Sequence, residues 1–221
     1  MAFAFIRTQQ LIVAGTSASA SLNLTTPAVQ GNLVLFHTKV LSSTTTILSL
    51  SDNVGNVYVT GSVIRNPTSA FQAQYQCYGV QVIAGAATMS ITMSAGGPNW
   101  FVAMDEFSGG ESTNAAVFDV AATNSGSTAS ASLAITASSA GKLIVAQFGG
   151  TGTPTLGSGW TNSLSTNQGM RVEYKLSGSA TELATSVLSA FAWTAIARSY
   201  NLYTAPTPPT SSPLIMMWNF D

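Results

Sequence analysis

Residues Ala129–Phe148 read ASASLAITASSAGKLIVAQF, and an earlier part of the chain has nearly the same sequence. The motif ASASL occurs at Ala18–Leu22 and again at Ala129–Leu133. In both places a glycine then opens an apolar segment, GNLVL at Gly31–Leu35 and GKLIV at Gly141–Val145. Self-similarity of this kind indicates a structural repeat. We therefore expect two copies of one unit, in which a small-residue strand leads through a glycine turn into a buried strand.

The two copies also end alike. The segment WFVAMDEF at Trp100–Phe107 corresponds to WTAIARSY at Trp193–Tyr200. Between these landmarks the first copy is longer than the second, which predicts about one additional pair of strands in the first half.

Strand patterns dominate the rest of the chain. Thr88–Ser94 alternates methionine or isoleucine with serine or threonine, as a half-buried strand does. Turn residues such as Ser51–Asn56 separate the apolar segments, and no stretch has a helical period over three turns. Short strands at regular spacing are typical of sandwiches and jelly rolls. The predicted fold is all-β, a jelly-roll-like antiparallel β-sandwich built from two internal repeats.

We predict a single sandwich domain over residues 1–203, with repeat halves at about 17–110 and 127–203 that are related by an approximate two-fold axis. A chain of 221 residues is long enough to bury a substantial core. The residues expected in that core are Leu33, Leu35, Leu143, Val145, Trp100 and Trp193.

Charge and hydropathy exclude several classes of partner. Charged residues are 7% of the chain and the net charge is −1, so no field attracts nucleic acid or an anionic membrane. No apolar run is long enough to span a bilayer. The segment Met1–Arg7 lacks the features of a signal peptide. We expect a protein that is made in a cytoplasm, with neither nucleic acid nor a membrane as partner.

The sequence offers little catalytic chemistry. His37 is the only histidine and lies in an apolar segment, which favours a core or edge histidine satisfied by the backbone. Asp105 and Glu106 are adjacent in a predicted strand and should point to opposite faces, so they cannot flank one bond. We predict no catalytic residues and no enzyme.

Metal and cofactor sites are not predicted either. Asp52 with Asn53 and Asn56 could hold calcium, but one carboxylate is a weak ligand set, and a turn held by side-chain hydrogen bonds is the favoured alternative. Cys77 is alone, which excludes an internal disulfide. The glycines at 149–152 lack the Lys-Ser/Thr of a phosphate loop.

Residues 204–221 have a composition of their own. Thr204–Pro213 has prolines at four of its last eight positions, which predicts an extended spacer. An apolar segment follows, and an exposed segment of this kind marks an interaction site. We predict that it docks on a neighbouring subunit or on the outer shell of a larger particle. The alternative is that it forms a last strand of its own sandwich. The predicted partner-binding residues are Leu214, Ile215, Met216, Met217, Trp218 and Phe220.

Several motifs resemble a known group of proteins. The strand Gly31–Leu35, the hairpin Ser51–Tyr58, the pair Ala84-Gly85 and the strand end Met104–Gly109 are similar to a pattern in β-sandwich proteins of tailed phages and some bacteria. The segment Gly157–Thr161 looks like part of the same pattern. The resemblance implies a jelly-roll-like virion surface or adhesive module without catalytic residues.

Two functional interpretations follow. The first is a structural virion protein of a tailed phage, a capsid decoration or cement protein that binds the shell and its neighbours; its location would be the virion. The alternative is a receptor- or carbohydrate-binding module of a phage tail or cell surface, which predicts exposed aromatics with Asn and Asp at one end of the sandwich. With so few charged residues, the edge strands lack the charges that hinder pairing with other chains. We therefore expect a homo-oligomer, with a trimer as the first expectation and a dimer as the second.

Charge placement yields one further hypothesis. Asp105 and Arg198 occupy matching places near the ends of the two repeats and have opposite charge. In a chain with so few ions, we expect these two to be paired with each other or placed at interfaces; the alternative is two solvated side chains that contribute little to stability.

Overall fold

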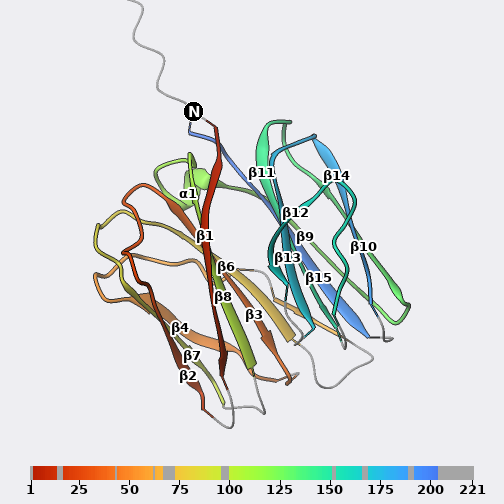
Figure 1. Cartoon of the computed structure of the whole chain (residues 1–221), viewed down its shortest axis with the longest axis horizontal. Helices are drawn as coiled ribbons and strands as arrows, with labels where there is room; N and C mark the ends of the chain where they lie inside the picture. Colours follow the sequence, from red (N-terminus) through yellow and green to blue (C-terminus); the bar gives the residue numbers. More distant parts are fainter. Residues whose placement is uncertain are drawn as a thin grey trace, which may run out of the picture.

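The computed structural model describes residues 2–13, 17–42, 44–61, 63–66, 73–95, 100–150, 153–165, 169–188 and 192–203. These residues form antiparallel strands and one helix of four residues, α1 (Asn114–Val117). The prediction of an all-β fold is confirmed. Four sheets lie side by side as layers (Figure 1).

The first repeat builds two of these sheets. A five-stranded sheet has the order β1-β8-β3-β6-β5, and a three-stranded sheet has the order β2-β7-β4. The strands are β1 (Ala4–Val13), β2 (Ser19–Asn23), β3 (Leu33–Val40), β4 (Ile47–Asp52), β5 (Val63–Arg65), β6 (Ala73–Val80), β7 (Thr88–Met93) and β8 (Trp100–Ser108).

The second repeat builds the other two sheets. Its five-stranded sheet has the order β12-β13-β11-β15-β9, and its outer sheet pairs β10 with β14. The strands are β9 (Phe118–Gly126), β10 (Ser130–Thr136), β11 (Lys142–Gly150), β12 (Thr161–Ser165), β13 (Met170–Gly178), β14 (Thr181–Val187) and β15 (Trp193–Tyr200).

Both repeats have jelly-roll pairing. In the first, the first strand pairs with the eighth, the second with the seventh and the third with the sixth. In the second, the corresponding pairs are β9 with β15, β10 with β14, and β11 with β13. The predicted jelly-roll-like repeat is therefore confirmed. Each copy begins one strand before its ASASL motif, at β1 and at β9. The additional element of the first copy is one strand, β4, rather than the expected pair.

Each repeat encloses a core of its own, and a third core joins them. One apolar cluster lies between the two sheets of the first repeat and another between those of the second. The third lies between the two five-stranded sheets, which pack face to face. Strands β3, β6, β8, β11 and β15 are therefore covered on both faces and buried along their length, except for the part-buried Ser108 at the end of β8. All six predicted core residues are buried.

The contact between the five-stranded sheets has approximate two-fold symmetry. Leu33 lies opposite Phe107 in its sheet, and Leu143 lies opposite Tyr200, so the repeats can be aligned residue by residue. By this alignment His37 corresponds to Gln147. His37 Nδ1 lies 3.3 Å from Gln147 Oε1, so these equivalent side chains meet at the centre of the interface. Contact between equivalent residues is what a two-fold interface produces.

Two aromatic clusters repeat this symmetry. Phe5 stacks on Tyr174 of the second repeat with ring centroids 5.1 Å apart. The equivalent Phe118 stacks on Tyr78 of the first repeat at 5.6 Å. Phe107 and Tyr200 complete the two clusters with edge-on contacts. Each repeat thus contributes one tyrosine to the other's cluster.

The matched charges also reach across the interface. Asp105 Oδ2 accepts a hydrogen bond of 2.7 Å from Ser163 of the second repeat. The guanidinium of Arg198 lies 5.3 Å from the ring of Tyr78 and against Gly61, in the first repeat. Ser163 and Gly61 are equivalent, because each lies two residues beyond the residue that faces the matching tyrosine. Both ions lie at the interface, as expected; a direct pair between them stays a prediction.

The shared core predicts that the repeats unfold together. Leu35 is fully buried in it, and Leu35→Ala should lower the free energy of unfolding by about 2–5 kcal/mol. Urea unfolding should keep a single transition, whereas Leu48→Ala, at a position 64% exposed, should change stability by less than about 0.5 kcal/mol. A second-repeat transition that Leu35→Ala leaves unchanged would contradict the shared core.

In the second repeat an irregular segment replaces the missing counterpart of β4. Along the edge of β14, Thr155 N donates to Val187 O at 3.0 Å, and Trp160 Nε1 donates to Leu183 O at 3.3 Å. Gly157 N donates to Glu173 Oε2 at 2.9 Å, which fixes the middle of this segment on a buried carboxyl. The edge of β14 is thereby covered without a strand.

Burial of Glu173 predicts a pH-dependent stability. Burial raises the pKa of this carboxyl from 4.5 to about 7, and the Gly157 hydrogen bond and the charges of Arg171 and Lys175 oppose the rise only partly. The stability associated with the neutral carboxyl is present below pH 4.5 and is lost as the pH rises through 7.

Glu173→Gln should therefore increase the free energy of unfolding at pH 8 by roughly 3 kcal/mol, at about 1.4 kcal/mol per pKa unit, and leave it nearly unchanged at pH 4. Urea unfolding at the two pH values measures the difference. An equal effect of the substitution at both pH values would show that the Glu173 carboxyl does not titrate in this way.

Candidate interaction surface

The turn after β4 is held by one carboxylate. Asp52 Oδ1 accepts hydrogen bonds from the backbone N–H groups of Val54, Gly55 and Asn56, at 2.7–3.1 Å. Its Oδ2 accepts from Asn56 Nδ2 at 2.8 Å and from Tyr58 Oη at 2.7 Å. The prediction of a turn held by side-chain hydrogen bonds is confirmed. All donors on Asp52 are N–H or O–H groups, the pattern of a structural turn rather than of a calcium loop.

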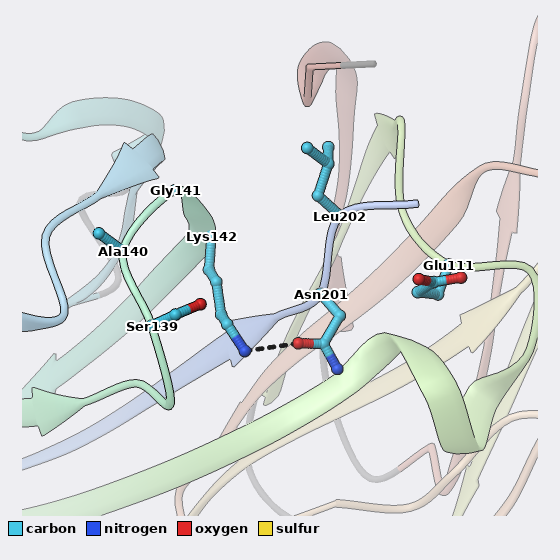
Figure 2. Close-up of a pocket in the computed structure, with 7 residues that line it drawn as sticks. All are labelled: Glu111, Ser139, Ala140, Gly141, Lys142, Asn201 and Leu202. Atoms are coloured by element: carbon cyan, nitrogen blue, oxygen red, sulfur yellow. Dashed lines mark hydrogen bonds between the residues drawn. The ribbon is translucent and has the colours of Figure 1, made fainter. Parts of the chain in front are cut away.

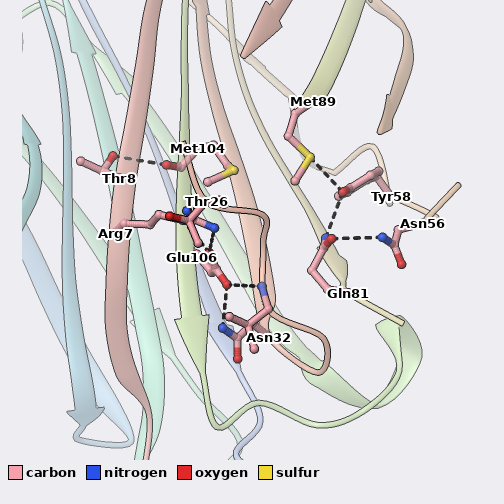
Figure 3. Close-up of polar contacts among 11 residues, drawn as sticks. Arg7, Thr8, Thr26, Asn32, Asn56, Tyr58, Gln81, Met89, Met104 and Glu106 are labelled. Carbon is pink, nitrogen blue, oxygen red and sulfur yellow. Dashed lines mark hydrogen bonds and ion pairs between the residues drawn. The ribbon is translucent and has the colours of Figure 1, made fainter. Parts of the chain in front are cut away.

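A second layer of contacts ties this turn to the end of β6. Gln81 Nε2 donates to Tyr58 Oη at 2.9 Å, and Gln81 Oε1 accepts from Asn56 Nδ2 at 3.1 Å (Figure 3). Ile83 exchanges backbone hydrogen bonds with the Asn56 side chain, at 2.7 and 3.0 Å. The residues after β4 and those after β6 therefore form one rigid unit.

Glu106, on β8, fixes the loop that precedes β3. Its carboxylate accepts from Arg7 at 2.6 and 2.7 Å, from Val29 N at 2.8 Å and from Asn32 Nδ2 at 2.7 Å (Figure 3). Asp105 points instead into the interface between the repeats, so the adjacent carboxylates lie on opposite faces as predicted. The residues before β3 are thereby held beside the unit described above, where Gln30 Nε2 donates to Val82 O at 2.8 Å.

These loops present an exposed apolar surface. Val57, Val82 and Ile83 are 71%, 61% and 46% exposed, and we call them the loop-end patch. They line a groove of about 250 Å³ together with Gly55, Asn56, Thr113 and Asn114, all of them uncharged. Asn114 fixes the groove wall, because its amide donates to Val57 O at 2.7 Å and accepts from Val80 N at 2.7 Å. The patch is thus rigid, apolar and accessible.

The corresponding end of the second repeat has a polar hollow instead. It is lined by Ser139–Lys142, Asn201, Leu202 and Glu111 (Figure 2). Lys142 Nζ lies 3.0 Å from Asp119 Oδ1 and 2.6 Å from Asn201 Oδ1, and it also donates to Ser138 Oγ. Burial acts to raise the pKa of Asp119, but hydrogen bonds from Ser199, Lys142 and Ser138 outweigh it and lower the pKa to about 2. The charge of Lys142 is compensated, so this hollow has little to offer an anionic ligand.

His37 is a core histidine, but side chains rather than the backbone surround its ring. Its Nε2 lies 3.3 Å from Asp105 Oδ2, and its Nδ1 faces Gln147. Ser163 donates to the carboxylate and not to the imidazole, which differs from the order of a nucleophile–base pair. All four of these residues are buried between the repeats. The position of His37 fits a structural role in the interface.

Other motifs from the sequence also have structural positions. Gly149 and Gly150 lie within β11, where a side chain at Gly149 would collide with Gln74 of the facing sheet. Cys77 is buried and free. Among the described residues, no three His, Cys, Asp or Glu side chains group as metal ligands do. No helix in the described part of the chain is long and apolar enough to cross a membrane.

The predicted partner-binding residues Leu214, Ile215, Met216, Met217, Trp218 and Phe220 lie outside the described residues. The described chain ends at Tyr203, whose N–H donates to Gly109 O at 2.9 Å. Leu202 pairs with Gly110 in an isolated bridge. The described chain therefore ends beside the link between the repeats, which leads through Thr113 into α1.

The loop-end patch could not be identified from the sequence. Val57, Val82 and Ile83 lie in segments whose sequence pattern predicts strands, and they look like ordinary core-facing residues there. Their exposure follows from where β4 and β6 end, which the sequence indicates only to within a few residues. The hairpin Ser51–Tyr58 was the available signal, because its turn residues mark a rigid tip.

Comparison with known proteins adds no relative to this description. The sequence matches no family model and no curated protein, and the structure matches no solved structure.

The Asp52 network should be necessary for the shape of the patch. Asp52→Ala leaves part-buried N–H and O–H donors without their acceptor, so we expect a loss of about 1–3 kcal/mol in the free energy of unfolding. Amide hydrogen exchange should accelerate at residues 53–58 and 81–83, while exchange in β11 stays proportional to global stability. Unchanged exchange in the turn would show that Asp52 does not hold it.

Proposed function

We propose that this chain is a structural virion protein of a tailed phage, a capsid decoration or cement protein without catalytic activity. In this proposal it binds the shell and neighbouring subunits, and the loop-end patch is one of its contact surfaces. The observation that carries the proposal is a rigid apolar patch at one end of a double jelly roll with very few charges. The motif resemblance to β-sandwich proteins of tailed phages supports the same assignment.

The energetic logic of the patch favours a permanent protein contact. Exposed apolar surface held in one shape loses little conformational entropy when a partner covers it. The Asp52 and Glu106 networks hold three loops in place before any partner arrives. A surface of this kind suits an assembly in which contacts form once and persist.

The alternative, a receptor- or carbohydrate-binding module, has less support. Sugar sites present exposed aromatic rings, whereas the exposed large hydrophobic side chains among the described residues are all aliphatic. Tyr58, which follows Val57 in the chain, is part-buried and uses its hydroxyl within the network. The patch therefore fits a protein surface better than a glycan.

The proposal includes two features that come from the sequence. Residues Leu214–Phe220 dock on a neighbouring subunit or on the shell, and the protein is a homo-oligomer, a trimer first and a dimer next. Both would cover apolar surface that a chain with 7% charged residues cannot shield with charge.

Sedimentation with purified phage particles tests the proposal. We expect the chain to co-sediment at a copy number that is a fixed multiple of the capsid subunits. Val82→Asp should reduce occupancy at least tenfold, because it places a charge in an apolar contact. The matched control Leu183→Asp, 57% exposed on the outer face of β14, should bind normally. Absence of the chain from particles, with binding to glycans or cells instead, would favour the alternative.

A further inference from the structure

We propose that the groove lined by the loop-end patch binds the segment Leu214–Phe220 of a second copy of this chain. The inference rests on the proposed function, in which the loop-end patch is a subunit contact, and it names the occupant.

The groove has the size and chemistry of this segment. Its volume of about 250 Å³ exceeds the roughly 150 Å³ of a cavity that holds benzene, so it can take an indole ring. Val57, Val82 and Ile83 supply apolar walls. The lining contains no charged residue, so a bound apolar side chain would bury no unpaired charge. Trp218 is the largest side chain of the segment, and tryptophan is enriched among residues that dominate protein interfaces.

The position of the chain's last described residue places the tail close to the groove. Tyr203 is hydrogen bonded to Gly109, and Thr113 lines the groove only four residues further along the chain. Four residues span at most roughly 14 Å, so the exit of the tail and the groove lie at the same end of the molecule.

The length of the spacer favours a second copy over the same chain. The ten residues Thr204–Pro213, if extended as their prolines predict, span roughly 30 Å. That length exceeds the distance from the exit to the groove of the same chain. A stiff linker that overshoots its target gives a low effective concentration within the molecule. The same linker suits a groove on an adjacent subunit.

The contact would be heterologous, because each copy offers one tail and one groove. Contacts of this kind close into rings or extend into filaments. A ring of three copies would account for the expected trimer, and a ring of two for the dimer.

Light scattering on the full chain, without particles, tests the inference. The wild type should associate at micromolar concentration. Val57→Asp places a charge in the groove, and Trp218→Ala removes the indole ring of the tail. Each substitution should weaken association at least tenfold. An equimolar mixture of these two variants should form a one-to-one dimer, since one intact tail meets one intact groove. Leu48→Asp, with its equally exposed position on β4, should associate like the wild type.

Other results would overturn the inference. A wild type that stays monomeric, while Val57→Asp shifts Trp218 fluorescence at every concentration, would place the tail in the groove of its own chain. Two single variants that associate like the wild type, or a mixture that stays monomeric, would exclude this contact. Circular dichroism confirms that each variant is folded, and Val82→Asp provides a second groove variant. If one of these results is obtained and the chain still binds phage particles, the proposed function holds and only the inference about the tail is wrong.

Discussion

The packing of the two five-stranded sheets against each other is the constraint on which the rest of this structure depends. Each repeat has a small outer sheet, three strands in one case and two in the other, so neither inner sheet could bury both faces alone. Leu33 and Leu35 of one repeat meet Leu143 and Val145 of the other in a common cluster. Burial of this apolar surface is the main favourable term, at roughly 25 cal/mol per Å². The aromatic rings exchanged between repeats add geometric specificity to that term.

The interface also explains how the repeats have diverged. Polar pairs such as His37 with Gln147 and Asp105 with Ser163 are buried there, where an unsatisfied group is costly. A change of one such residue alone would leave its partner unpaired in the core, at a cost in stability. The loops at the ends of the sandwiches are free of this constraint. The first repeat has an apolar groove there. The second has a polar hollow, in which the charge of Lys142 is compensated by Asp119.

The sequence predicted the repeat, the jelly-roll-like β fold and the buried strands, because hydrophobic pattern and turn residues specify them locally. It did not predict that each copy forms a sandwich of its own. Strands such as β3 and β11 are apolar on both faces whichever sheet covers the second face, so pattern alone cannot separate one thick sandwich from two. The start of each repeat was missed because Ala4–Val13 and Phe118–Gly126 share little sequence. The loop-end patch was missed because its exposure depends on tertiary packing.

Native-state hydrogen exchange tests the central claim, that one shared interface stabilises both repeats. The amides of β3 and β11 should exchange with the same free energy of opening, equal to that of global unfolding, because neither inner sheet is stable without the other. Substitution of Leu143 by alanine should lower both values together. A lower opening free energy for β11 than for β3, or an effect of Leu143→Ala confined to the second repeat, would contradict the account and show two sandwiches that fold independently.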